Sequence, residues 1–125
     1  MLGGHDVAAT LAVNDIDSAR SFYEGKLGLA PVMEFPDGVI YGAGNSRLMV
    51  YRSEFAGTNK ATAATWAVGD QLDAIVQDLR AKGVAFEHYD LPNATRNGDI
   101  HEAEGMRGVW LKDPAGNIIG LVNQE

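Results

Sequence analysis

A weak internal duplication constrains the fold of this chain more than any other feature. The stretch Val13–Ala19 resembles the stretch Val68–Ala74, which begins 55 positions further on. The same spacing of 55 relates Gly28 to Gly83, and each of these glycines follows a helix-like apolar pattern. Repetition at one offset predicts that a single supersecondary unit occurs twice.

Each copy predicts a strand, a helix and three further strands. The first strands are expected at Asp6–Val13 and Thr62–Val68, and the helices follow with Asn14 or Asp15 and then Asp70 as N-caps. The helices show apolar stripes at Ile16, Ala19, Phe22, Tyr23 and Leu27, and at Leu72, Ile75, Val76 and Leu79. The later strands are expected at Pro31–Phe35, Val39–Gly42, Ser46–Arg52, Val84–Tyr89, Arg107–Lys112 and Asn117–Asn123. The sequence therefore predicts an α+β fold of two βαβββ modules, about 5–55 and 60–125, in one domain.

The second copy is longer than the first. Gly44 and Gly116 open the turns before the last strands and lie 72 positions apart rather than 55, so about 17 residues are added. The polar, aperiodic segment Asp90–Gly105 is the expected place of this addition. A loop of that length is usually functional or mobile, so we expect either a lid over a cavity or a plain mobile loop.

Composition excludes several classes of function. The net charge of −7 and the pI near 4.8 argue against nucleic-acid binding and against anionic membranes. The chain has no cysteine, which excludes disulfides, thiolate metal sites and cysteine nucleophiles. No leader peptide and no apolar run of membrane-spanning length is recognisable. We therefore expect a cytoplasmic globular protein.

Three motifs together carry a resemblance to a known family. They are Val13-x-Asp15-x-x-x-Ala19-x-x-Phe22-Tyr23, Leu27-Gly28-Leu29 and Lys112-Asp113-Pro114-x-Gly116-Asn117. With the duplication they span nearly the whole chain, which resembles the vicinal-oxygen-chelate superfamily of glyoxalase I, bleomycin-resistance proteins and extradiol dioxygenases. The resemblance implies that the modules build a curved mixed sheet whose concave face forms a ligand cavity. It also implies that the helices lie on the convex side.

The resemblance also implies where a metal ion would bind. The typical site of the family takes one His or Glu from the first and last strand of each module. Those positions fall on Ala8, Ala63 and Gly120, and on Leu48 or, with the register shifted by one, on Met49. None of these side chains supplies the imidazole, carboxylate or thiolate that divalent cations need. We therefore expect no metal and no other cofactor, which puts the family's metal chemistry in doubt for this chain.

Strand parity predicts which side chains line the cavity. In the first strands, Leu11 and Trp66 are expected to pack under the helices, while Thr10 and Thr65 face the cavity. The sequence does not decide whether Tyr41, Tyr51 and Trp110 line the pocket or belong to the core. The expected ligand-binding residues are Ala8, Thr10, Leu48, Met49, Tyr51, Ala63, Thr65, Trp110 and Gly120. Such a small and mostly apolar floor suits an apolar or aromatic ligand.

Catalytic candidates are few. The stretch 101–104 combines a histidine with two carboxylates within four residues. It is either a loop-borne acid–base pair, an improvised metal site or a hydrated acidic loop. We take His101, Glu102 and Tyr51 as the candidate catalytic residues.

The other histidines and Glu87 are expected outside the site. His5 precedes the first strand with the wrong parity for the cavity, so we expect it on the surface. Glu87 and His88 are neighbours in one expected strand, so at most one of them faces inward. Glu87 matches no family ligand position and is expected to be solvated.

Two functions from different classes follow from these observations. The favoured one is a metal-free binder that sequesters an apolar or aromatic molecule, as bleomycin-resistance proteins do. The alternative is a lyase, isomerase or dioxygenase-type enzyme that acts on a small oxygenated metabolite with non-standard catalytic residues. In either case we expect a small-molecule ligand, no nucleic-acid or membrane partner, and a homodimer. A scaffold role has no positive feature in the sequence.

Overall fold

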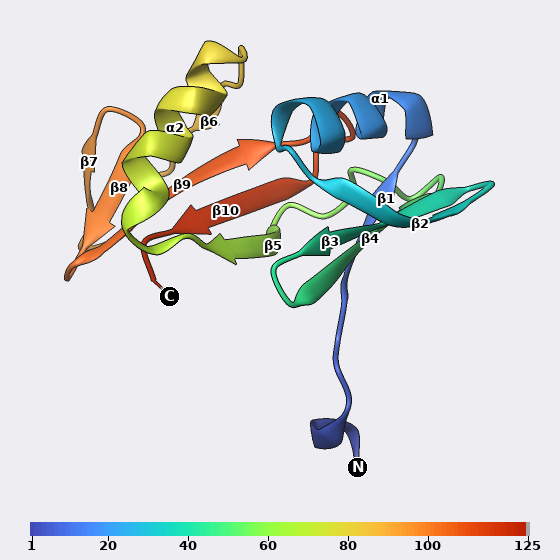
Figure 1. The fold of residues 1–125 in the computed structure, drawn as a ribbon. Coiled ribbons are helices and arrows are strands. Elements are labelled where there is room, and N and C mark those ends of the chain that lie inside the picture. The colour runs from blue at the N-terminus through green and yellow to red at the C-terminus, as the bar shows by residue number, and fades with distance from the viewer. Residues whose placement is uncertain (125) are drawn as a thin grey trace. The chain divides into compact units, whose positions relative to one another are not determined.

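A computed structural model describes residues 1–124, which divide into two compact units. Unit 1 comprises Met1–Lys60 together with Pro114–Asn117, and unit 2 comprises Ala61–Asp113 together with the chain from Ile118. Residues 1–124 contain ten strands in two mixed sheets and two α-helices, and Figure 1 labels them. The α+β prediction is confirmed.

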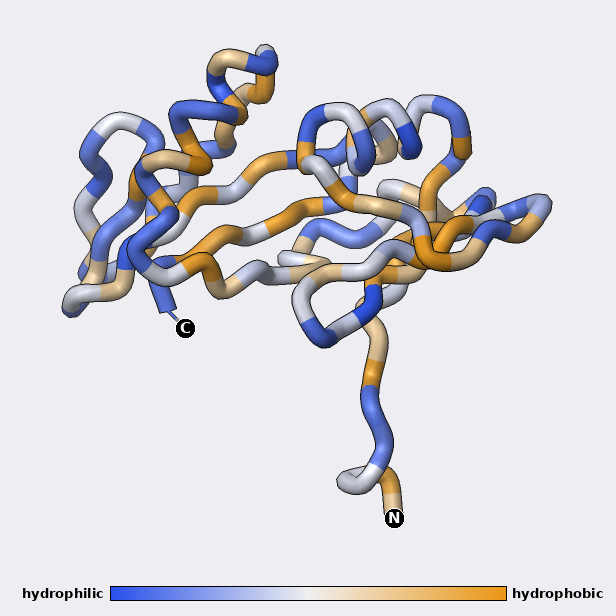
Figure 2. Tube along the Cα trace, viewed as in Figure 1, coloured by the Kyte–Doolittle hydropathy of each residue, from blue (hydrophilic) through white to orange (hydrophobic). Residues whose placement is uncertain are grey.

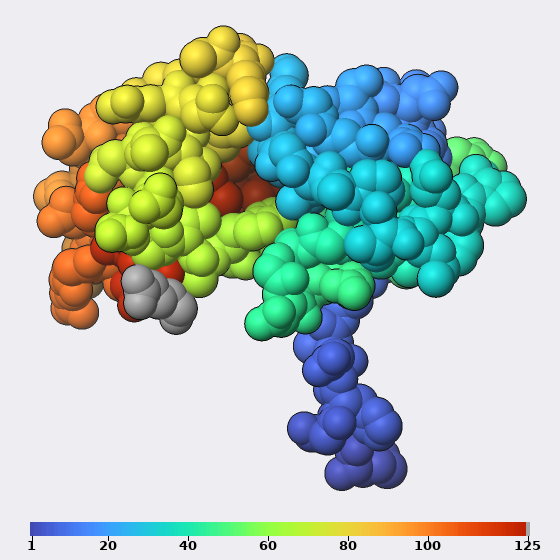
Figure 3. Space-filling view, viewed as in Figure 1, coloured from blue at the N-terminus to red at the C-terminus, as the bar shows by residue number. Residues whose placement is uncertain are grey.

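Unit 1 is a four-stranded mixed sheet with helical turns on one face. Its strands β1 (Ala9–Val13), β2 (Ala30–Phe35), β3 (Gly38–Ala43) and β4 (Ser46–Arg52) have the order β1-β4-β3-β2. β1 and β4 are parallel, and the other neighbours are antiparallel. Helix α1 (Ile16–Arg20) continues as a π-helix, Ser21–Lys26. A 3-10 turn, Leu2–Gly4, lies in the N-terminal segment, which projects from the rest of unit 1 (Figure 3).

Alternation along the strands builds the core of unit 1. Leu11 and Val13 are buried on one face of β1, as the parity of the sequence predicts. The side chain of Asp15 accepts the backbone N–H of Ser18 at 3.2 Å, so Asp15 is the N-cap. Gly28 has φ +73°, the left-handed conformation that ends a helical segment at low cost only for glycine. The buried apolar side chains of this unit are Leu11, Val13, Ala19, Phe22, Tyr23, Val39, Tyr41, Leu48 and Val50.

Unit 2 repeats this pairing order and extends it. Its strands are β5 (Thr62–Ala67), β6 (Phe86–Glu87), β7 (Thr95–Asn97), β8 (Ile100–Ala103), β9 (Met106–Lys112) and β10 (Ile118–Val122). The order is β5-β10-β9-β8-β7, β6 also pairs with β9, and β5 runs parallel to β10. A 3-10 turn (Gly69–Gln71) leads into helix α2 (Leu72–Ala81). The core of this unit consists of Leu72, Val76, Leu79, Val109, Leu111, Ile119 and Leu121.

The structure corrects three expectations from the sequence. The first strand begins at Ala9 rather than at Asp6, and Val7 is 89% exposed. Asp70 does not cap α2, because it lies inside the 3-10 turn and the N-cap residue of α2 is Gln71. The segment Asp90–Gly105 is not a plain loop, since β7 and β8 form a hairpin that pairs with β9.

The hairpin escaped prediction because it is short and polar. Its strands contain three and four residues, and Figure 2 shows β7 in the colours of hydrophilic residues. It is held by pairing with β9, which no local pattern encodes. Among residues 1–124, no helix is both long and apolar enough to cross a membrane.

Candidate functional site

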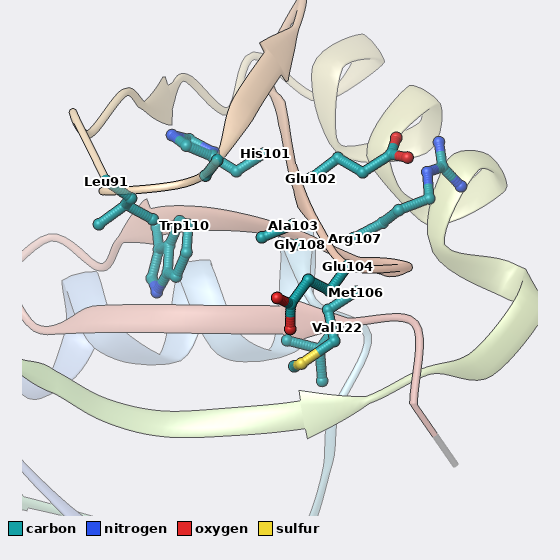
Figure 4. A pocket seen from close by; sticks show the side chains of 11 residues that line it. Leu91, His101, Glu102, Ala103, Glu104, Met106, Arg107, Gly108, Trp110 and Val122 are labelled. Atoms are coloured by element: carbon teal, nitrogen blue, oxygen red, sulfur yellow. The ribbon is translucent and has the colours of Figure 1, made fainter.

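A pocket of about 320 Å³ lies within unit 2, beside the hairpin formed by β7 and β8. Figure 4 shows the side chains that line it. Its apolar wall is formed by Leu91, Ala94, Ala103, Met106, Trp110 and Val122. Gly108, Trp110 and Val122 share one face of the sheet by register, and the buried Val109 and Leu121 point to the face that packs under α2. The added hairpin therefore borders a pocket on the sheet face opposite the helix.

His101 is the buried polar residue of this pocket. It lies on β8 opposite Gly108, is only 4% exposed, and its ring centroid lies 4.9 Å from that of Trp110. The backbone N–H of Tyr89 donates to its Nε2 at 3.0 Å. Its Nδ1 is buried and has no hydrogen-bond partner among residues 1–124. Because Nε2 accepts a hydrogen bond, the neutral ring carries its proton on Nδ1, so a buried donor is left unpaired.

Tyr89 supplies a second unpaired group next to His101. Its hydroxyl is buried and lacks a partner within the described part of the chain. Its ring centroid lies 5.5 Å from that of Trp110 and 6.3 Å from that of His101. We call Tyr89, His101 and Trp110 the ring cluster. Sequence reasoning missed Tyr89, which lies just beyond the short strand β6 (Phe86–Glu87) rather than in the longer strand expected at Val84–Tyr89.

Trp110 lies across Gly120, the position where the family resemblance places a metal ligand. The two residues are directly opposite each other on β9 and β10, and the indole Nε1 donates to the hydroxyl of Thr62 at 3.2 Å. A Cβ built on Gly120 would lie 3.3 Å from that Nε1 and 3.3 Å from the hydroxyl of Thr65. The small floor expected from the sequence is therefore not a void, because the indole covers it.

A β-bulge explains the identity of these neighbours. The pairing of β10 with β5 shifts register between Ile118 and Ile119, so that Thr62 and Ala64 take successive positions in the ladder. Ala63 is left between them without a ladder partner. Thr62 and Thr65 both approach Gly120, although they are three residues apart. Thr65 shares the sheet face of Gly120, and its role in ligand binding stays a prediction. Strand parity could not anticipate Thr62, because a bulge interrupts the period of two.

Glu102 and His101 are not brought together. Neighbouring residues of a strand alternate between its faces, and Glu102 pairs with Arg107, whereas His101 pairs with Gly108. The Arg107 guanidinium contacts the Asp73 carboxylate of α2 at 2.8 and 3.0 Å. These hydrogen bonds hold the pKa of Asp73 below its usual range and raise the pKa of Arg107 above its own. β8 therefore directs the side chains of His101 and Glu102 to opposite faces, and an acid–base role for the stretch 101–104 stays a prediction.

The sheet face that holds Trp110 also carries an ion pair. Glu87 of β6 stands opposite Trp110, and the Lys112 ammonium lies 3.5 Å from its carboxylate. Its neighbour His88 approaches Asp99 instead, with 2.7 Å between His88 Nε2 and a carboxylate oxygen. Hydrogen bonds from His88 and then from Arg80 hold the pKa of Asp99 below its usual range. Glu87 is thus the inward-facing member of the pair, and Asp99 links the hairpin to α2.

In unit 1, the structure separates the expected ligand residues by face. Thr10 and Met49 are opposite each other on β1 and β4, as are Ala12 and Tyr51. Leu48 is 2% exposed and belongs to the core, so the shifted alternative, Met49, occupies the face away from α1.

Ala8 lies outside the sheet of unit 1, and Tyr41 lies in its core. Ala8 precedes β1 and borders a separate hollow of about 640 Å³ beside Val7 and Arg47. Tyr41 is a core residue whose hydroxyl donates to Glu24 at 2.8 Å. Burial and the Glu24 carboxylate raise the pKa of Tyr41 above its usual range. Tyr51 is 38% exposed, and His5 is exposed as expected.

The residues at the family's metal positions do not fit a metal ion. Ala8, Met49, Ala63 and Gly120 offer no imidazole, carboxylate or thiolate. The indole of Trp110 packs against Gly120, where a ligand side chain would stand. Within residues 1–124, no three His, Cys, Asp or Glu side chains are grouped so that they could hold an ion.

Comparison with known proteins places the whole chain in one family. The model of the Glyoxalase/Bleomycin resistance protein/Dioxygenase superfamily matches residues 6–121. No curated protein matches the sequence at a significant level.

Solved structures share the fold. A bleomycin-binding protein from Streptomyces verticillus, complexed with copper(II)-bleomycin, is 24% identical with a TM-score of 0.73, covering 97% of both chains. Lactoylglutathione lyase from Agrobacterium tumefaciens is 21% identical with a TM-score of 0.71, covering 94% of this chain and 92% of the other. A bleomycin resistance determinant encoded on transposon Tn5 is 20% identical with a TM-score of 0.72, covering 97% and 98%. At these identities the likeness is one of fold.

Proposed function

We propose, from the premise that this chain belongs to the Glyoxalase/Bleomycin resistance protein/Dioxygenase superfamily, that it binds a small organic molecule without a metal ion and without turnover. One observation carries the proposal. Trp110 lies across Gly120, so an aromatic side chain occupies the position where a metal ligand of the family would stand, and the same indole forms a wall of the pocket. A ring in that place serves binding of an apolar surface rather than Lewis-acid chemistry.

The size and lining of the pocket support an apolar or aromatic ligand. Its volume of about 320 Å³ lies at the lower end of the range of small-molecule sites, roughly 300–1,000 Å³. Each Å² of apolar surface that a ligand removes from water there stabilises the complex by about 25 cal/mol. Bleomycin-binding proteins with the same fold have been solved in complex with bleomycin, and sequestration of a ligand needs affinity alone. The lyase or isomerase alternative is less favoured, because β8 directs the side chains of His101 and Glu102 to opposite faces, although both residues border the pocket.

Metal analysis and a binding titration test the proposal together. The purified chain should contain no stoichiometric zinc, nickel, iron or manganese by mass spectrometry. Calorimetric titration with a naphthalene-sized aromatic compound should show one site, and the compound should be recovered unchanged. About one metal ion per chain, or turnover of S-lactoylglutathione by the purified protein, would instead support the enzyme alternative.

Two further expectations are proposed with this function. We propose a homodimer, which sedimentation equilibrium tests at several protein concentrations. We also propose a cytoplasmic location, which fractionation of the source cells tests. Neither is needed for the pocket to bind its ligand.

A further inference from the structure

We propose that His101 is the residue that determines ligand specificity in this pocket, and that it selects an uncharged or cationic aromatic molecule with a carbonyl oxygen. The inference rests on the proposed function, since it names the class of ligand for the same pocket. His101 acts here as a hydrogen-bond donor rather than as a general base. Three features of unit 2 lead to this conclusion: a fixed tautomer, an unpaired neighbour and the charges at the rim.

The backbone determines which ring nitrogen of His101 donates. Nε2 is occupied as an acceptor by the N–H of Tyr89 at 3.0 Å, so the proton of the neutral ring is on Nδ1. That nitrogen is buried, and among the described residues nothing accepts its hydrogen bond. Buried polar groups in native proteins are nearly always paired, and an exception calls for an unseen partner. A ligand oxygen is the partner that a binding pocket can supply.

The neighbours of His101 narrow the acceptor to a carbonyl-like oxygen. The hydroxyl of Tyr89 is the second buried unpaired group, and its ring lies 6.3 Å from that of His101. The indole N–H of Trp110 is already donated to Thr62, so Trp110 offers only its ring surface. A carbonyl oxygen has two lone pairs and can accept from both His101 and Tyr89, while an attached aromatic ring packs on the indole.

The charges at the rim disfavour an anionic ligand. Glu102 and Glu104 line the pocket, together with the single cation Arg107. Arg107 is engaged by Asp73 through two contacts of 2.8 and 3.0 Å, so it is not available to a ligand carboxylate. The chain as a whole carries a net charge of −7. A neutral ketone or amide, or a cation that carries one, meets no such repulsion.

Access to His101 requires a small movement of one turn. The Nδ1 atom of His101 and the hydroxyl of Tyr89 are both covered. Leu91 and Ala94 line the pocket and close a tight turn, in which the N–H of Ala94 donates to the carbonyl of Leu91 at 3.3 Å (Figure 4). The lid expected over the segment 90–105 stays a prediction; Leu91, Ala94 and residues 101–104 of this segment border the pocket. A ligand that reaches His101 displaces the turn 91–94 alone, because the hairpin beyond it is held by β9.

Three naphthalene derivatives of similar shape test the proposal on the full chain by calorimetric titration. The ketone 2-acetylnaphthalene should bind roughly tenfold more tightly than 2-ethylnaphthalene, the gain expected of one net hydrogen bond. The anion 2-naphthoate should bind more weakly than the ketone. In His101→Phe, the tenfold ratio should fall, and in the double variant His101→Phe/Tyr89→Phe the ketone and the hydrocarbon should bind equally. In the control His88→Gln, which changes an exposed neighbouring histidine, the tenfold ratio should persist.

The outcomes separate this inference from the proposed function. If the hydrocarbon and the ketone bind the wild-type chain equally well, the donor role of His101 is wrong and the binding function stands. If none of the three probes binds, both proposals fail. Nitrogen-15 NMR of the unliganded protein provides a test that needs no variant: a proton on Nε2 of His101 would overturn the inference even if His101→Phe does not fold.

Discussion

The two units share one strand order, and one row of side chains across the sheet differs between them. In unit 1 the row runs through Thr10 of β1, Met49 of β4 and Ile40 of β3. In unit 2 the corresponding row contains Thr65 of β5, Gly120 of β10 and Trp110 of β9. Unit 1 has two side chains of medium size in this row, Met49 and Ile40. Unit 2 has no side chain at Gly120 and a very large one at Trp110.

This redistribution explains why the ring cluster belongs to unit 2. A side chain at Gly120 would meet the indole at 3.3 Å, so glycine there is the condition for Trp110 to lie flat across β10. The added hairpin then places His101 against the free side of the indole. One missing side chain and one inserted hairpin thus accompany the pocket in unit 2, while the helix and core keep the pattern of the repeated module.

The largest expected effect tests the shared part of the two units, the core face. Leu11→Ala in unit 1 and Leu111→Ala in unit 2 remove side chains that are 1% and 0% exposed. Each should lower the free energy of unfolding by about 2–5 kcal/mol, measured by urea denaturation. The controls Thr10→Ala and Thr65→Ala, on the opposite faces, should cost less than about 1 kcal/mol. A Leu11→Ala loss as small as that of its control would show that the faces of unit 1 are assigned the wrong way round.

Exchanging residues of this row between the units tests whether Gly120 and Trp110 depend on each other. Gly120→Met copies unit 1 into unit 2 and should cost about 1–3 kcal/mol, because the new side chain displaces the indole from Thr62. Adding Trp110→Ile should recover part of the loss, with a coupling energy of about 0.5–3 kcal/mol by urea denaturation. Additive losses would mean that Gly120 and Trp110 do not depend on each other.

The smallest expected effect is on the stability of the protein at low pH. Arg20 holds the pKa of Glu24 below its ordinary value of 4.5 in unit 1, and His88 with Arg80 holds that of Asp99 below 3.8 in unit 2. A depressed carboxylate pKa stabilises the fold above the ordinary value, and this contribution is lost as the pH falls through the folded-state pKa. Glu24→Gln and Asp99→Asn should each flatten the loss of stability below about pH 4.5, by up to about 1 kcal/mol for such partly exposed pairs. Thermal melts from pH 6 to pH 2 measure this loss of stability, with the exposed Glu54→Gln as the control. If Glu54→Gln flattens the loss as much as the other two variants do, the ion pairs of Glu24 and Asp99 are not its source.

Much of this fold follows from local patterns. The strand Ser46–Arg52 has the predicted bounds, and Leu11 and Val13 face the helix because side chains alternate along a strand. The glycines that end the helical segments, Gly28 and Gly83, have the positive φ that their position requires. The lack of donor side chains at the family's metal positions could also be read directly, since it depends on residue type alone.

Contacts between strands that are far apart in the sequence decided the features that only the tertiary structure could reveal. The register of β4 selected Met49 over Leu48, and the bulge opposite β10 brought Thr62 beside Thr65. The period of two cannot predict either, because a shift of one residue exchanges the two faces. The sequence by itself determined two modules with apolar core faces. The pocket of the ring cluster required the structure, because a hairpin without a local signal supplies His101 and a backbone N–H selects which of its nitrogens donates.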